Sequence, residues 1–408
     1  MRAVMVAMIV VVLGACGAAV PPVHGKGGPA WTELTSEHFT VWTDGDPANV
    51  RELMREMEYL REVVSSVMFP STPASARTLV IVLRDDDELA EFSPTGEPRP
   101  YAMSAHPPLR QPLIVLSEFS NRDPRNLRLA HELTHVISFG VVHYQPRWFA
   151  EGMAEFFETV RLDPDAATAV VGNPPEEPVA HLEPIAQLFQ WRDISSDEEH
   201  HYSTAWALFT FLVAEHANEL VQFARLLDRS ELDGDEMTEQ MARLWGEGFR
   251  SLPLGELDGR LALWLRTGRH LVLHVTMQHH NWPIAERALG DADTYAIRAA
   301  LRIELGKKEQ ARPDVNAAIA LEPNHVLGRL LGVAIDQKMI TVEQARSLVA
   351  AHPGDWRAWW LVTLAIEEVD GDQKEYDEAR AKTCGMVAHN AALAPPRPLC
   401  PARENAAR

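Results

Sequence analysis

The feature that most constrains this chain is the run His131-Glu132-Leu133-Thr134-His135, which has the pattern H-E-x-x-H. On an α-helix, residues four apart share one face, so the two imidazoles can reach the same point in space. Zinc binds imidazole nitrogens at about 2.0–2.1 Å, and in catalytic sites it also takes an oxygen ligand and a water. Glu132 is placed to act on that water as a general base. The pattern therefore predicts a helix that presents a zinc site.

The residues around this pattern carry the signals that begin and end helices. Asp123 is a helix-capping residue and Pro124 suits the first helical position, so we expect the helix to begin there. Gly140 is a suitable stop. After a short turn, Pro146 opens a second helix. The sequence thus predicts two consecutive helices, the first of which carries the histidines.

The second helix brings an acidic companion to the histidines. Residues 148–155 read W-F-A-E-G-M-A-E, in which Glu151 and Glu155 share one face. We assign Glu151 as the third zinc ligand and Glu155 as the partner of the far nitrogen of a ligand histidine. Gly152 lets its backbone come close to a neighbour. A solvated helix face is the alternative for Glu151, but the adjacent H-E-x-x-H pattern favours the metal site.

Residues 131–135 and 151–155 together resemble the gluzincin metallopeptidases, specifically the peptidase MA-like group, which is often described only as a domain of unknown function. Weaker similarity lies at residues 31–34 and 38–42, and the resemblance covers roughly residues 30–270. It implies that His131, His135 and Glu151 bind Zn²⁺ and that Glu132 is the catalytic base. It also implies a thermolysin-like fold for this part of the chain.

The first residues indicate export. Residues 1–16 resemble a lipoprotein-type signal peptide, with an apolar run at 4–13 that is too short to span a membrane. Leu13-Gly14-Ala15-Cys16 resembles a bacterial lipobox, in which Cys16 is lipidated; an ordinary cleaved signal peptide is the alternative. Residues 17–30 then form a flexible tether. We expect an exported protein, lipid-anchored in a bacterial envelope on the periplasmic face or the cell surface.

The cysteine count agrees with this expectation. The chain has 3 cysteines, which is an odd number for an exported protein. Lipidation of Cys16 leaves Cys384 and Cys400. An oxidising compartment permits a disulfide between these two.

Length and charge bound the remaining possibilities. A chain of 408 residues exceeds a typical single domain, so we expect two. The formal net charge of −20 argues against nucleic acid and anionic membrane surfaces as partners, which leaves the lipid anchor as the membrane contact. We expect an α+β chain. The resemblance implies a thermolysin-like zincin lobe, with a small mixed sheet and the active-site helices, over residues 31–275. We expect an all-α, tetratricopeptide-like domain over residues 283–400.

The first lobe contains several runs typical of strands. Residues 39–42, 78–83 and 113–116 are apolar or β-branched, and residues 47–68 between them are helical. In the resembled family, the strand nearest the zinc helix is a sheet edge that pairs with an extended substrate. Residues 113–117 are the candidate for this role, and an ordinary core strand is the alternative.

Two further segments follow the second helix. Prolines interrupt residues 161–182, which we expect to form a loop that could cover the cleft. Tyr202 opens an amphipathic helix, and the reaction needs a hydrogen-bond donor for the oxyanion. In gluzincins this donor is a tyrosine or histidine downstream of the third ligand, so Tyr202 is our first candidate, with His201 and His200 behind it. The alternative is that Tyr202 only caps the helix and packs.

The C-terminal part changes character. Pro323 and Pro353 are 30 residues apart, close to the tetratricopeptide period of 34, and residues 318–324 resemble the end of such a repeat. Two or three degenerate repeats would form a concave surface for a protein partner, whereas a nonrepetitive helical domain is the alternative. The expected helices are residues 293–306, 308–321, 324–337, 341–351, 355–369 and 373–391.

Two functions remain open. The first is zinc-dependent hydrolysis of peptide bonds in a peptide or protein substrate. The second is a catalytically silent tetratricopeptide lipoprotein that acts as an interaction scaffold. A lobe that has lost its activity usually lacks a ligand or the base, and here all four residues are present, which favours the enzyme.

Overall fold

The computed structural model describes residues 20–69, 77–103, 109, 111–118, 127–142, 144–165, 167–173, 182–192, 199–230, 237–267, 272–336, 338–388 and 400. The predicted signal peptide with Cys16, and the expected helix start at Asp123 and Pro124, lie outside these residues. Within the described part, no helix is long and apolar enough to cross a membrane.

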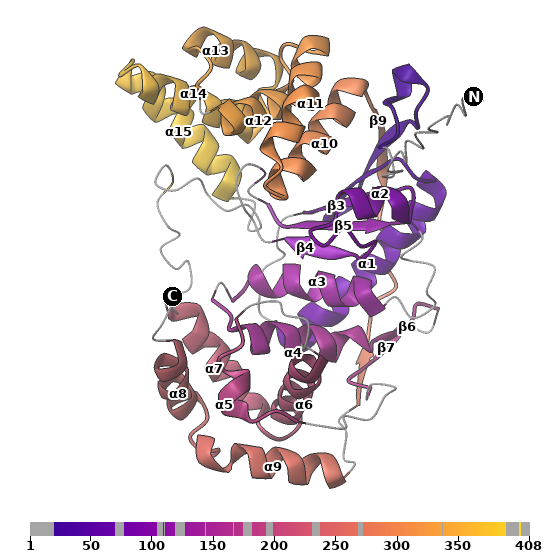
Figure 1. The fold of residues 1–408 in the computed structure, drawn as a ribbon, viewed down its shortest axis with the longest axis vertical. Coiled ribbons are helices and arrows are strands. Elements are labelled where there is room, and N and C mark those ends of the chain that lie inside the picture. Colours follow the sequence, from indigo (N-terminus) through magenta and orange to yellow (C-terminus); the bar gives the residue numbers. More distant parts are fainter. Residues whose placement is uncertain are drawn as a thin grey trace, which may run out of the picture.

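A mixed sheet of six strands forms the middle layer of the molecule, in the order β4-β5-β3-β2-β1-β9 (Figure 1). β2, β3 and β5 run parallel, and the other strands are antiparallel to their neighbours. The strands are β1 (Trp31–Thr35), β2 (Phe39–Thr43), β3 (Thr78–Leu83), β4 (Tyr101–Met103), β5 (Leu113–Ser117) and β9 (Ala285–Leu289).

Both faces of this sheet are covered, which explains why its central strands are apolar throughout. Val80 and Val82 of β3 point into one core, whereas Leu79 and Ile81 point into the other. Side chains alternate between the faces of a strand, so a strand buried on both sides shows no polar positions. The mixed α+β character that the sequence predicts is therefore confirmed.

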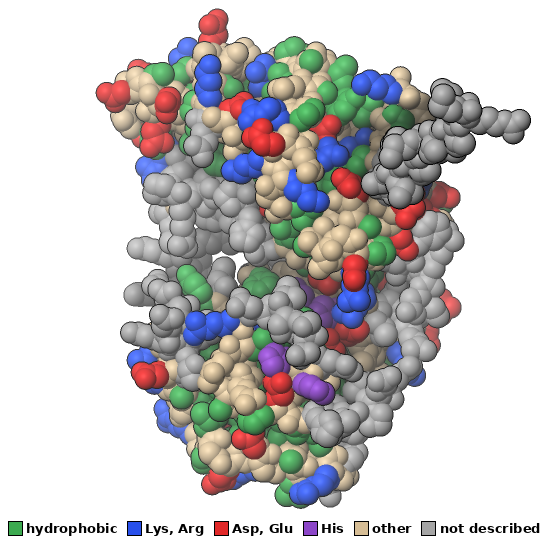
Figure 2. Space-filling model, viewed as in Figure 1, with side chains coloured by type: hydrophobic (Ala, Val, Ile, Leu, Met, Phe, Trp, Pro, Cys, Tyr) green, Lys and Arg blue, Asp and Glu red, His purple; other side chains and the backbone are tan. Residues whose placement is uncertain are grey.

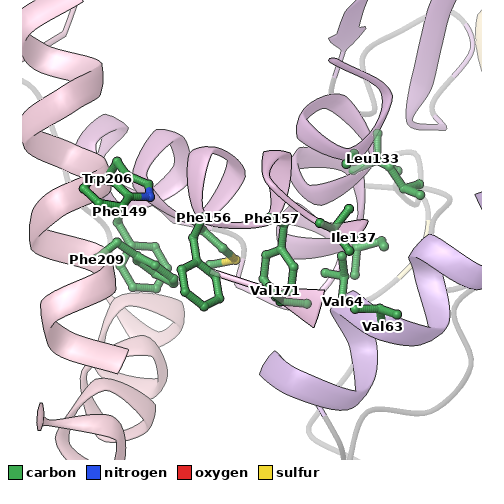
Figure 3. Packing of buried hydrophobic residues seen from close by; sticks show 14 of the residues in the cluster. Val63, Val64, Leu133, Ile137, Phe149, Phe156, Phe157, Val171, Trp206 and Phe209 are labelled. Atoms are coloured by element: carbon green, nitrogen blue, oxygen red, sulfur yellow. The ribbon is translucent and has the colours of Figure 1, made fainter. Parts of the chain in front are cut away.

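The first core lies between the sheet and the helices that carry the candidate site. In Figure 3, Phe149 and Phe156 of α4 lie against Phe209 of α6, while Phe157 lies toward Val171 and the helices α1 and α3. α1 begins as expected at Pro47, capped by Asp46, whose side chain accepts a 2.8 Å hydrogen bond from the Ala48 amide. The helices are α1 (Pro47–Met68), α3 (Leu127–Phe139), α4 (Arg147–Glu158) and α6 (Glu199–Glu215).

Four further helices, which follow α4 along the chain, form the lower part of the molecule in Figure 1 together with α6. Trp148 of α4 joins them through aromatic contacts with Phe189, Phe223 and Trp245. These helices are α5 (Ile185–Leu188), α7 (Ala217–Arg229), α8 (Met237–Gly248) and α9 (Leu254–Thr267). A short helix, α2 (Asp86–Glu91), contacts β3 and β5, and its Leu89 packs in the core that contains Leu79 and Ile81.

The structure corrects the predicted edge strand. Residues 113–117 form β5, which pairs with β3 on one side and with β4 on the other, so β5 is an internal strand. β4, residues 101–103, is the edge next to α3. A strand of only three residues carries too short an alternation to be recognised in the sequence.

The expected loop over residues 161–182 is also corrected in part. Residues 161–163 and 168–171 form two antiparallel strands of a three-stranded sheet, and residues 174–181 lie outside the described part. The third strand lies at residues 273–276, about 100 residues further along the chain, so its pairing with residues 168–171 is not visible in the local sequence. The strands are β6 (Arg161–Asp163), β7 (Thr168–Val171) and β8 (Leu273–Thr276).

The boundary predicted at residue 283 divides a structural unit. Residues 285–289 form β9, which pairs antiparallel with β1 at the far edge of the sheet. Ile297 and Leu301 of α10 then join Leu79 and Ile81 in the core on the second face of the sheet. β9 and α10 therefore pack with the first lobe, so residue 283 is not where a separate core begins.

Each of the six helices predicted in this part is present in the described residues, which end at residue 388 in the last of them. Cys384 of α15 is joined to Cys400 by a disulfide, which is the pairing suggested by the cysteine count. The helices are α10 (Asp291–Glu304), α11 (Lys308–Leu321), α12 (Val326–Asp336), α13 (Val342–Ala351), α14 (Trp356–Glu368) and α15 (Gln373–Ala388). α10 contacts α11, α11 contacts α12, α13 contacts α14, and α14 contacts α15.

Candidate metal site

Two helices that pack against each other, α3 and α4, bring the predicted ligands together. His131 and His135 lie one turn apart on α3, and Glu151 lies on α4, which begins after Pro146 as expected. Figure 2 shows histidine side chains (purple) beside acidic ones (red) in the middle of this face, at the level of α3, α4 and α6. Only 4% of His131 is exposed.

The three candidate ligand atoms form a nearly equilateral triangle. His131 Nε2 lies 3.1 Å from His135 Nε2, and Glu151 Oε2 lies 3.3 Å from each of these nitrogens. Ligands that lie about 2.0–2.1 Å from a tetrahedral zinc ion are about 3.3–3.4 Å from one another. The triangle therefore has the dimensions of one face of a zinc coordination tetrahedron.

The electrostatics of this triangle favour a positive charge. Burial by itself would lower the pKa of His131, but the hydrogen bonds with Glu151 and Glu158 outweigh it and hold that pKa well above its ordinary value. Burial would raise the pKa of Glu151, but the two imidazoles hold the pKa of this carboxyl well below its usual range. Glu151 is thus ionised, and a proton or a metal cation beside it is stabilised.

The donor set fits a metal ion better than a proton. Two imidazole nitrogens 3.1 Å apart repel each other through their lone pairs unless a proton or a cation lies between them. A proton satisfies one pair of atoms, whereas a cation satisfies all three. The Nδ1 atom of His135 is buried and has no hydrogen-bond partner among the described residues. Two nitrogens and one carboxylate oxygen are the ligand set of a catalytic zinc site.

The far nitrogen of His131 has a partner that the sequence reasoning missed. Its Nδ1 lies 2.9 Å from Oε2 of Glu158, and 3.5 Å from Oε1 of Glu155. Glu158, and not Glu155 as predicted, is therefore the nearer partner of the far nitrogen of His131. The histidine reaches the end of α4, where Glu158 lies two turns beyond Glu151 on the same face.

Glu155 supports this hydrogen bond from the preceding turn. Burial, and then the charge of Glu158, raise the pKa of Glu155 to about 7. The hydrogen bonds with His131 and Glu155 hold the pKa of Glu158 below its usual value, against the effect of burial. His131, Glu155 and Glu158 could themselves hold a cation. That arrangement would make one imidazole bridge two cations, so we assign a hydrogen bond to Nδ1.

Glu132 lies beside the triangle on α3. It interacts electrostatically with His131, His135 and Glu151, and burial raises the pKa of its carboxyl. Its interaction with the two imidazoles acts in the opposite direction. The residue predicted as the base therefore lies near all three candidate ligands.

Gly152 explains how α6 comes close to the site. A Cβ atom at Gly152 would lie 2.5 Å from the carbonyl oxygen of Ala205 and 3.0 Å from Cβ of Phe209. Only glycine permits this approach, as the sequence predicted. The close contact between α4 and α6 brings the start of α6, with Tyr202, to the start of α4.

Tyr202 lies in a polar and aromatic cluster at this point. Its hydroxyl oxygen is 3.5 Å from Nη2 of Arg147, and its ring contacts Trp191 edge-on at 5.0 Å. Arg147 in turn lies 3.7 Å from Glu151, measured from Nε to Oε1. His201 contacts Trp191 and pairs with Glu183, whereas His200 is exposed.

Tyr202 is therefore connected to the candidate ligand Glu151 through Arg147, which the sequence analysis did not single out. Arg147 and Glu158 could have been found from helical spacing. Arg147 lies four residues before Glu151, and Glu158 lies seven residues after it.

One family model matches the segment that contains this site. The model is described as "Protein of unknown function (DUF1570)", and it matches residues 128–232. The match includes the histidines, Glu151 and Tyr202. Searches of curated proteins and of solved structures found no match.

Proposed function

We propose that this chain is a zinc metallopeptidase of the gluzincin type that hydrolyses peptide bonds in a bacterial cell envelope. The observation that carries the proposal is the triangle of His131 Nε2, His135 Nε2 and Glu151 Oε2, whose edges measure 3.1, 3.3 and 3.3 Å. The matching family is associated with peptidase-like proteins, which supports the same reading.

The roles of the residues follow from their positions. Zn²⁺ held by the triangle would act as a Lewis acid on a water molecule and on the substrate carbonyl. Glu132 accepts the proton of the attacking water and delivers it to the amine that leaves. Burial raises the pKa of Glu132, which brings this carboxyl closer to neutral pH and suits a group that both takes and returns a proton.

The substrate is an extended peptide in this proposal. In the described part of the sheet, β4 is the edge strand next to α3, so it replaces β5 as the candidate partner of the substrate backbone. An edge strand offers unpaired amide and carbonyl groups to an extended chain. Tyr202 remains our candidate donor to the oxyanion, because its hydroxyl lies in the cluster that reaches Glu151 through Arg147.

We also propose export and a lipid anchor at Cys16, for which the disulfide between Cys384 and Cys400 is supporting evidence, since such bonds persist in oxidising compartments. α10 packs against α11 and α14 packs against α15, which supports a tetratricopeptide-like surface for a protein partner.

The proposal predicts that Glu132→Gln keeps zinc and loses turnover. Glutamine preserves the size of the side chain but cannot accept a proton, and general base catalysis contributes about 10²–10⁴-fold. We expect about one zinc per chain in both proteins. Hydrolysis of an unstructured protein such as casein should fall by at least about 10²-fold in the variant. Zinc content is measured by atomic emission.

Glu239→Gln, on the exposed side of α8, is the matched control and should leave zinc and turnover unchanged. Equal hydrolysis by wild type and Glu132→Gln would contradict the proposal. Zinc binding without any hydrolysis in a broad peptide screen would favour the scaffold alternative instead.

A further inference from the structure

Arg147 occupies a position between the metal site and the oxyanion donor that the proposed mechanism does not use. It is the first residue of α4, one turn before Glu151, and its side chain is 17% exposed. Its guanidinium contacts three separate elements: α4 itself, α6 and the segment that follows α5. This arrangement differs from an ordinary surface arginine, whose charged group lies in water.

The two carboxylate oxygens of Glu151 face different partners. Oε2 lies 3.3 Å from Nε2 of both histidines, whereas Oε1 faces Nε of Arg147 at 3.7 Å. A carboxylate can bind a metal through one oxygen or through both. The positive charge of Arg147 attracts Oε1 and keeps it on the far side of the carboxylate, so that Oε2 alone faces the histidines.

The guanidinium is itself held in place. Its Cζ atom lies 4.6 Å from the centre of the Trp191 ring, and only 5% of Trp191 is exposed. Nη1 donates to the carbonyl oxygen of Arg192 at 3.4 Å. Stacking on an aromatic face suits arginine better than lysine, because the guanidinium is planar. The ring contact and the hydrogen bond together restrain the plane of the group.

The guanidinium also faces Tyr202. Nη2 lies 3.5 Å from the Tyr202 hydroxyl oxygen. Arginine can only donate, so the hydroxyl oxygen is the acceptor and its hydrogen is directed away from Arg147. The same guanidinium therefore sets the orientation of both Glu151 and Tyr202.

We infer that Arg147 is a positioning residue that holds Glu151 as a one-oxygen metal ligand and orients the Tyr202 hydroxyl toward the reacting carbonyl. This inference rests on the proposed metal site. It adds a residue that touches neither the metal nor the substrate but determines how two residues that do so are presented.

The test compares Arg147→Met and Arg147→Lys with Arg192→Gln in the full chain. Methionine keeps an apolar stem over Trp191, lysine keeps the charge without the planar fork, and exposed Arg192 is the matched control. Zinc affinity is measured by competition with a chromophoric chelator. We expect it to fall about 10–100-fold in Arg147→Met, which is the usual effect of losing a group that orients a ligand, and less in Arg147→Lys. Arg192→Gln should match wild type.

The visible absorption of the Co²⁺-loaded protein provides a second readout. When both oxygens of Glu151 bind, the coordination number rises and the absorption of Co²⁺ weakens. We expect weaker absorption in Arg147→Met and an unchanged spectrum in Arg192→Gln. A residue that only packs on Trp191 would change thermal stability and leave the Co²⁺ spectrum as in wild type.

The outcomes separate this inference from the proposed function. Wild-type zinc affinity together with a wild-type Co²⁺ spectrum in Arg147→Met overturns the role of Arg147 only. Hydrolysis that is equal in wild type and Glu132→Gln overturns the peptidase proposal and leaves the metal measurements valid, because these need no substrate. A wild-type chain that binds no zinc overturns both.

Discussion

At the scale of single residues, the candidate site is a series of contacts that runs from Glu151 through His131 to the carboxylates of Glu158 and Glu155. Glu151 faces Nε2 of His131, and the Nδ1 atom of His131 is hydrogen-bonded to Glu158. Glu155 is in turn hydrogen-bonded to Glu158. An imidazole whose far N–H has an anionic acceptor is a better metal ligand and has a defined ring orientation. The order of these contacts determines which substitutions weaken metal binding.

Glu158→Gln should weaken zinc binding more than Glu155→Gln. Glutamine at residue 158 removes the negative charge that lies 2.9 Å from His131 Nδ1, and the loss of such a partner typically costs about 10–100-fold in metal affinity. Glu155 lies 3.5 Å away, so its variant should lose less. Chelator competition at one fixed pH measures both. A larger loss in Glu155→Gln would return the role to Glu155, as the sequence first indicated.

At the scale of elements, the contact between α4 and α6 brings the start of α6, with Tyr202, next to Arg147 at the start of α4. The two helices are closest at Gly152, where the backbone of α6 occupies the place of a side chain. Phe149 and Phe209 fill the space beside this contact (Figure 3). The absence of a side chain at Gly152 therefore allows the short distance between the two helices.

Gly152→Ala should push these helices apart. The new Cβ would lie 2.5 Å from the Ala205 carbonyl oxygen, and overpacking of this kind costs about 1–3 kcal/mol. The free energy of unfolding, measured by urea denaturation, should fall by that amount. Gly259→Ala on α9 is the matched control, because its Cβ meets nothing within 4 Å, and it should stabilise the chain by up to about 1 kcal/mol. Equal effects of the two substitutions would contradict the close packing.

At the scale of the whole molecule, a buried cluster of charges joins the sheet to the C-terminal helices. Asp44 follows β2, Glu88 lies on α2 and Arg298 lies on α10; their exposed fractions are 5%, 4% and 4%. Arg298 Nη2 is 3.7 Å from Glu88 Oε1, and Asp44 Oδ1 accepts a hydrogen bond from the Arg84 amide. Burial, and then the charge of Asp44, raise the pKa of Glu88 to about 8, although Arg298 and Arg84 act against this.

This cluster predicts that stability falls as pH rises from about 4.5 to about 8. In that range the folded protein keeps a proton on Glu88 that the unfolded chain has lost, so each unit by which the pH rises lowers the free energy of unfolding. Glu88→Gln removes the titration, and at pH 8 it should gain on the order of a few kcal/mol relative to wild type. The gain should vanish near pH 5. Thermal unfolding across this range measures the effect.

Asp87→Asn, on the exposed side of α2, is the control for Glu88→Gln and should follow the pH dependence of the wild type. A difference between Glu88→Gln and wild type that stays constant from pH 5 to pH 8 would contradict the assignment to Glu88.

The sequence by itself determined the features that depend on local spacing. Residues four apart on a helix share a face whatever the fold, so it could be predicted that His131 shares a face with His135 and that Glu151 shares a face with Glu155. The lack of a side chain at Gly152 likewise indicated that its backbone can come close to a neighbour. The C-terminal helices were predictable for the same reason, since their starts and ends carry local signals. The alternation of mixed strands and helices also identified the α+β class.

Only the tertiary structure decided the features that depend on pairing between distant segments. β4 became the sheet edge and β9 joined β1 because of neighbours far along the chain, which a run of three or five residues does not reveal. Glu158 and Arg147 have the right helical spacing, but their roles arise from the packing of α3, α4 and α6. Helical spacing fixes a direction within one element, whereas distances between elements are set by the packing of the whole core.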